Sequence, residues 1–228
     1  HSGGDTDTAE LAITVTGIAP QAVNDTGAVN ENATLAVNAA SGVIGNDDDN
    51  ASYDSESLAV TSIVSMSTSN SGNAAAAITG TYGVLTMAAD GSYSYVANTA
   101  AAEALDVDDE VTDVFTYTLK DDADVNSSTA TLTITVTGVD DDPAGVNDTG
   151  AVNEDKTLTV STGNGVLSND TDADDSSSMS VSAISGGTVG QAKNGTYGVL
   201  TLNANGSYAY VANVAAKEIE SDPVVEIL

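Results

Sequence analysis

The chain has 228 residues, enough for one large or two ordinary domains, and its 34 acidic against 4 basic residues give a formal net charge of -30. All the basic residues are lysines, so the guanidinium groups that grip phosphate are absent, and nucleic acid and anionic membranes are poor partners. Cysteine is absent and no apolar run approaches the ~20 residues of a membrane span, which argues against disulfides, thiolate metal sites and membrane insertion.

The first predicted element is a strand near the start of the chain. Leu11-Ala-Ile-Thr-Val-Thr-Gly17 closely matches Leu132-Thr-Ile-Thr-Val-Thr-Gly138, which closes a later repeat. We therefore predict that residues 1–18 are the closing strand of a preceding repeat. A strand of this type also suits donation to a neighbouring subunit, which would polymerise the chain head to tail.

Residues 19–139 are predicted to form one complete repeat. Val23-Asn-Asp-Thr-Gly-Ala-Val-Asn-Glu31 recurs unchanged at residues 146–154, and Thr81–Asn98 has a close match at residues 196–213. The internal repeat therefore organises the chain as tandem domains of one kind.

The local pattern within the repeat is that of β-strands. Residues 130–137 alternate apolar and polar side chains, with Leu132, Ile134 and Val136 predicted to face inward. Asp90-Gly91 and Asn205-Gly206 predict two-residue hairpins with positive φ at both positions. The recurring strand tyrosines are interpreted mainly as core. The pattern predicts an all-β chain of tandem antiparallel β-sandwich domains.

The predicted linker, residues 138–148, is short and acidic. It carries Asp140, Asp141, Asp142 and Asp148. A metal ion bound there would set the angle between the two domains. Without metal the linker is expected to bend freely, because like charges and few apolar side chains offer no packed interface.

Residues 140–228 are predicted to be a second repeat that lacks its final strand. Asp170, Asp172 and Asp174 alternate along the chain, and a turning segment would aim all three at one hard cation such as calcium. Asp47 and Asp49 mark the matching place in the first copy. The EF-hand pattern is absent, and a solvated acidic loop is the alternative interpretation.

These motifs resemble the VCBS and bacterial cadherin-like repeats of large secreted adhesins, whose domains are Ig-like or cadherin-like sandwiches. The resemblance rests on Val152-Asn-Glu-Asp155, on Gly165–Asp174 and on Gly198–Asn213, and it covers nearly all of the chain. It implies calcium sites built from the glutamate near each repeat start, the acidic loop and the linker. The residues so implied are Glu154, Asp170, Asp172, Asp174 and Asp140 to Asp142, with Glu31, Asp47 and Asp49 in the first copy.

The leading functional hypothesis is a calcium-stiffened extender in an extracellular or cell-surface bacterial adhesin or fibre, with neighbouring repeats or subunits as partners. Catalysis finds little support, because His1 is the one histidine and no serine has an evident base partner. The alternatives are a strand-donating fibre subunit and a module that binds surface glycans. The glycan hypothesis has carboxylates in its favour but no tryptophan and few aromatic side chains.

Overall fold

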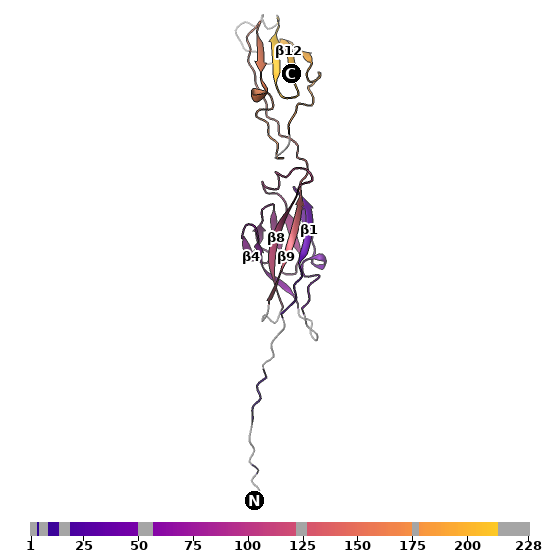
Figure 1. Cartoon of the computed structure of the whole chain (residues 1–228), viewed down its shortest axis with the longest axis vertical. Coiled ribbons are helices and arrows are strands. Elements are labelled where there is room, and N and C mark those ends of the chain that lie inside the picture. The colour runs from indigo at the N-terminus through magenta and orange to yellow at the C-terminus, as the bar shows by residue number, and fades with distance from the viewer. Residues whose placement is uncertain are drawn as a thin grey trace. The chain divides into compact units, whose positions relative to one another are not determined.

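The computed structural model describes residues 4, 9–13, 19–49, 57–121, 127–174 and 178–213. Contacts divide the chain into two compact units, and each is described by itself. Unit 1 comprises His1–Ala102 and Glu110–Thr137, and unit 2 comprises Glu103–Asp109 and Gly138–Leu228. Apart from two short 3-10 helices, the regular elements of the described residues are strands, which confirms the predicted all-β class (Figure 1).

Unit 1 is a sandwich of two sheets. One sheet has the strand order β1-β9-β8-β3-β4, and the other has the order β2-β7-β6-β5. The strands are β1 (Asp25–Asn30), β2 (Thr34–Val37), β3 (Ala59–Ser65), β4 (Ser71–Asn73), β5 (Ala77–Thr79), β6 (Val84–Met87), β7 (Tyr93–Val96), β8 (Glu110–Lys120) and β9 (Ser127–Thr137), and the 3-10 helix η1 spans Ala39–Ser41.

The core of unit 1 lies between these sheets. The three inward residues predicted for β9, Leu132, Ile134 and Val136, are fully buried. Tyr95 of β7 and Phe115 of β8 are also fully buried, and their rings meet edge to face with centroids 6.1 Å apart. Aromatic pairs favour this geometry, so these two rings join the two sheets.

One pairing differs from an antiparallel sandwich. Edge strand β1 runs parallel to β9, with Asp25 opposite Leu132 and Asn30 opposite Thr137. After β1 the chain crosses to the other sheet to form β2 instead of turning back as a hairpin. The first and last strands of unit 1 therefore run in the same direction.

The hairpin turns also differ from the prediction of positive φ at two successive residues. Gly91 has φ 80° and Gly206 has φ 79°, but Asp90 and Asn205 are outside the positive-φ region. Asp90 Oδ1 instead accepts hydrogen bonds from the Ser92 N–H (3.1 Å) and hydroxyl (2.6 Å). This side-chain turn keeps Asp90 in an ordinary conformation, so only the glycine needs the left-handed region.

The described residues of unit 2 form one sheet with the order β10-β13-β12-β11. It corresponds strand for strand to the β2-β7-β6-β5 sheet of unit 1. Its elements are β10 (Thr157–Val160), the 3-10 helix η2 (Thr162–Asn164), β11 (Ala192–Asn194), β12 (Gly198–Leu202) and β13 (Tyr208–Ala212). Among the residues described, no helix is long and apolar enough to cross a membrane.

Gly163 within η2 and Gly165 directly after it allow a matched test of backbone packing in unit 2. A Cβ on Gly165 would lie 2.2 Å from the carbonyl oxygen of Gly206, whereas a Cβ on Gly163 would meet nothing within 4 Å. We expect Gly165→Ala to lower the unfolding free energy of unit 2 by about 1–3 kcal/mol, because two backbone segments must separate. Gly163→Ala is the control and is expected to leave stability unchanged or slightly higher.

Hydrogen exchange of unit 2 peptides during denaturant titration measures this difference. Equal stability of the two alanine variants would contradict the close approach of the Gly165 and Gly206 backbones.

Candidate metal-binding site

In each unit, the acidic loop is hydrogen-bonded in the same way to the first residue of the repeated Val-Asn-Asp motif. In unit 1, the Val23 N–H donates to Asp47 Oδ1 at 2.7 Å. In unit 2, the Val146 N–H donates to Asp170 Oδ1 at 2.6 Å. Asp47 and Asp170 therefore hold their loops in place, whatever else their second oxygens bind.

Backbone bridges extend this contact in both units. Gln21 and Asp48 exchange two hydrogen bonds of 2.7 and 3.1 Å, and Ala144 and Thr171 exchange two of 2.8 and 3.1 Å. The residue that follows each bridge, Asp49 or Asp172, is half-buried. The local fold thus fixes the backbone directly before the second predicted ligand of each loop.

Unit 2 brings together three of the predicted ligands. The Asp141 N–H donates to Asp174 Oδ2 at 3.0 Å, and the Asp174 N–H donates to Asp172 Oδ1 at 3.2 Å. Carboxylate oxygens of Asp141 and Asp174 lie within 4.8 Å of each other. Asp174 is only 7% exposed, so its negative charge is largely removed from water.

This donor set fits a hard divalent cation. Carboxylate oxygens are the ligands that calcium prefers, and no thiolate or imidazole competes in this cluster. Two carboxylates at about 4.8 Å repel by roughly 3 kcal/mol at an effective dielectric constant near 20. A bound cation would turn that repulsion into attraction.

Glu31 belongs to unit 1, where it directly follows β1. Its side chain is 2% exposed, and its N–H donates to the Thr137 carbonyl at 2.9 Å. Thr137 is the last residue of β9 and is followed directly by the acidic linker. Glu154, at the same place in the second repeat motif, is exposed.

The other predicted ligands lie at the surface. Asp140, Asp142 and Asp148 are exposed. Within unit 2, hydrogen bonds connect Asp141, Asp172 and Asp174 among the predicted ligands.

Unit 1 contains a buried tyrosine that the sequence analysis did not connect with the acidic loop. The Tyr117 hydroxyl lies 2.9 Å from Asp25 Oδ2, 3.4 Å from Asp47 Oδ2 and 3.0 Å from the Val23 carbonyl. Burial raises the pKa of Asp25 and of Asp47 above the usual 3.8. Hydrogen bonding with Tyr117 offsets part of the rise in each pKa. At neutral pH the folded unit therefore bears the cost of ionising two partly buried carboxyl groups.

A second residue missed as a functional position is Asp113 in β8. It is fully buried, and its carboxylate accepts the N–H groups of Thr81 (2.8 Å) and Tyr82 (3.0 Å). It also accepts the Tyr95 hydroxyl at 2.6 Å. Asp113 is thus satisfied by three donors and joins the two sheets; this acid is structural.

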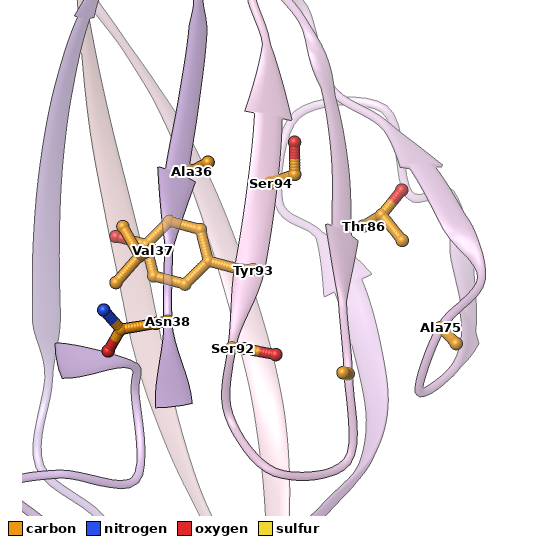
Figure 2. A pocket seen from close by; sticks show the side chains of 9 residues that line it. Ala36, Val37, Asn38, Ala75, Thr86, Ser92, Tyr93 and Ser94 are labelled. Carbon is orange, nitrogen blue, oxygen red and sulfur yellow. The ribbon is translucent and has the colours of Figure 1, made fainter. Parts of the chain in front are cut away.

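A shallow hollow of about 480 Å³ lies on unit 1 (Figure 2). Small side chains line it, including Ala36, Thr86, Ser92 and Ser94. The one aromatic residue of the lining, Tyr93, is 7% exposed and presents its ring toward Val37. Glycan binding, which usually needs an exposed aromatic face, stays a prediction without support from this hollow.

Comparison with known families gives one result for both units. The model of a family described as bacterial cadherin-like domain matches residues 18–138 and, a second time, residues 140–225. A search of curated proteins finds no significant match. The two matched ranges follow the internal repeat found in the sequence.

Proposed function

The chain belongs to the bacterial cadherin-like domain family, and on that premise we propose that it is a calcium-stiffened extender in an extracellular bacterial adhesin or surface fibre. Domains of this family are non-catalytic structural modules, typically at the cell surface. The observation that carries the calcium part of the proposal is the close approach of the Asp141 and Asp174 carboxylates, with Asp172 bonded to the Asp174 backbone. Neighbouring repeats, joined head to tail, are the proposed partners.

The ligand roles follow from the contacts. Asp174 is the central ligand, because it is the most buried of the three and is bonded to the backbone of Asp141. Asp141 contributes from the linker, and Asp172 contributes from the loop. Calcium, when bound, supplies the positive charge that holds these carboxylates together.

We propose that Glu31 is a calcium ligand of unit 1. Its backbone is bonded to Thr137, and the chain from Thr137 to Asp141 spans at most about 14 Å when fully extended. The linker that carries Asp141 therefore begins at the strand end to which the Glu31 backbone is bonded. An ion bound by the linker carboxylates would restrict the linker and stiffen the pair of units.

Small-angle scattering with excess calcium and with chelator tests this function. Calcium is expected to increase the maximum dimension of the particle and to narrow its range of conformations, while magnesium, which needs a smaller octahedral site, has a weaker effect. Superimposable scattering curves in calcium and in chelator would contradict the extender hypothesis. Titration calorimetry on the same sample measures binding separately from stiffening.

Asp90→Asn is the matched control for charge. Asp90 is exposed, and its counterpart in unit 2 is already an asparagine, Asn205, with the same pair of bonds to Ser207. This variant removes one negative charge and is expected to keep the full calcium response. Strand donation by residues 1–18 stays a separate prediction, for which deletion of residues 1–17 and measurement of oligomer size is the test.

A further inference from the structure

The parallel contact between β1 and β9 is a continuous attachment of the first strand of unit 1 to the last. Six residue pairs form the ladder, from Asp25 opposite Leu132 to Asn30 opposite Thr137. The Glu31 N–H donates to the Thr137 carbonyl at 2.9 Å beyond one end. The contact therefore covers the full length of β1.

Side-chain hydrogen bonds extend the same contact beyond the N-terminal end of β1. Asn24 Oδ1 accepts the Thr131 N–H at 3.0 Å, and Ser128 Oγ accepts the Ala22 N–H at 3.3 Å. With these bonds the contact begins three residues before β1. Residues 22–31 are thus held along β9 by backbone and side-chain bonds together.

Strand β9 is the fixed partner in this contact. It lies inside the sheet between β1 and β8, and its inward side chains Leu132, Ile134 and Val136 are fully buried. Strand β1 is at the sheet edge and is packed close to the core at Gly27. A Cβ on Gly27 would lie 2.8 Å from side-chain atoms of both Ile134 and Leu35.

We infer that the β1–β9 pair is the force-bearing clamp of unit 1. The inference rests on the proposed role as an extender, in which tension enters before β1 and leaves after β9. Because the two strands are parallel, that tension pulls them in opposite directions along their own axes. All the bonds of the ladder are then loaded together in shear, instead of one after another as in peeling.

The clamp also keeps tension from reaching the other strands of the unit. Strands β2 to β8 lie in the chain between β1 and β9, so they carry no tension until the clamp separates. Separation would then release residues 25–137 together, about 400 Å of extended chain. Rupture force follows the barrier to unfolding, so it depends on the clamp more than on the overall stability of the unit.

Force spectroscopy on the full chain tests the clamp by changing the direction of pulling. The sequence has no cysteine, so introduced cysteines are unique attachment points. Pulling from the two ends loads β1 and β9 in shear, whereas pulling from Asn30→Cys and Thr137→Cys peels apart one pair at a time. We expect the peeling force to be less than about half the end-to-end force, because the bonds no longer act together.

A proline pair tests the same point within one pulling geometry. The Glu31 N–H points to β9, and N–H groups alternate in direction along a parallel edge strand, so the Val29 N–H faces β9 and the Ala28 N–H faces away. Val29→Pro is expected to lower the end-to-end rupture force, whereas Ala28→Pro leaves it nearly unchanged. Val29→Ala controls for the lost side chain.

The outcomes separate this inference from the calcium hypothesis. Equal rupture forces in the two pulling geometries would overturn the clamp. This comparison uses no proline variant, so misfolding caused by a proline cannot affect its outcome. All measurements are made in calcium and in chelator. A calcium-independent particle length with strong shear resistance would leave the clamp standing and remove the calcium part of the proposed function.

Discussion

Replacing Asp113 with alanine is expected to lower the unfolding free energy of unit 1 by about 3–5 kcal/mol, the cost typical of breaking a buried charged network. Asp113 is fully buried, and three donors converge on it, from Thr81, Tyr82 and Tyr95. Its removal leaves two backbone N–H groups and one hydroxyl without their acceptor. Natural domains have a total stability of only about 5–15 kcal/mol, so unit 1 would be close to unfolding.

The contacts around Asp113 leave little room for compensation. A Cβ on Gly80 would lie 2.2 Å from Asp113 Oδ2, so the turn at Gly80 is packed directly against the carboxylate. Alanine at position 113 therefore creates a space as well as unsatisfied donors. Tyr95→Phe removes one donor only and is expected to cost about 1.5–3 kcal/mol, the range for hydrogen bonds to charged groups.

A double-mutant cycle of Asp113→Ala and Tyr95→Phe measures the coupling between the two side chains. We expect the double variant to be less destabilised than the sum of the single variants, because each single change already breaks their shared bond. Asp90→Asn controls for the lost charge and should change stability little. Equal losses for Asp113→Ala and Asp90→Asn would show that Asp113 acts only through net charge.

The sequence predicted best those features that depend on neighbouring residues. The alternation in residues 130–137 indicated which side chains of β9 are buried, and Leu132, Ile134 and Val136 are fully buried. Period-two alternation is local, so it survives without knowledge of the partner strand. The repeat likewise predicted two domains of one kind, and the β10-β13-β12-β11 sheet has the same order as the β2-β7-β6-β5 sheet.

Features that depend on distant parts of the chain were not predictable in this way. The role of Asp113 requires the Thr81 turn to come from the opposite sheet, and nothing near position 113 shows this. The parallel pairing of β1 with β9 joins segments more than a hundred residues apart. Only the folded chain places such partners together.

The acidic loops show the same limit for the candidate site. Asp170 and Asp172 are two residues apart and look equivalent in sequence. In the structure Asp170 accepts the Val146 N–H, whereas Asp172 accepts the N–H of Asp174 beside the linker. The sequence indicated where the carboxylates gather, and the backbone partners distinguish loop anchors from metal-site candidates.

Replacing Asp174 with asparagine is expected to change the stability of unit 2 in opposite directions with and without calcium. In chelator the variant should be as stable as the natural chain or more stable, because it removes a largely buried charge next to Asp141 and Asp172. In calcium it should be less stable, because the cation loses a central ligand. This reversal of sign separates a metal ligand from a loop anchor.

The size of the calcium effect follows from mass action. At a calcium concentration of about one hundred times Kd, binding stabilises the folded unit by about 2.7 kcal/mol, and a tenfold loss of affinity removes about 1.3 kcal/mol of this. Thermal unfolding in calcium and in chelator measures both states of the Asp174→Asn variant. Asp170→Ala is the informative comparison, because loss of the acceptor for the Val146 N–H should destabilise unit 2 in both conditions. If Asp174→Asn instead lowers stability equally in calcium and in chelator, Asp174 is a structural anchor like Asp170, and the cation must bind elsewhere.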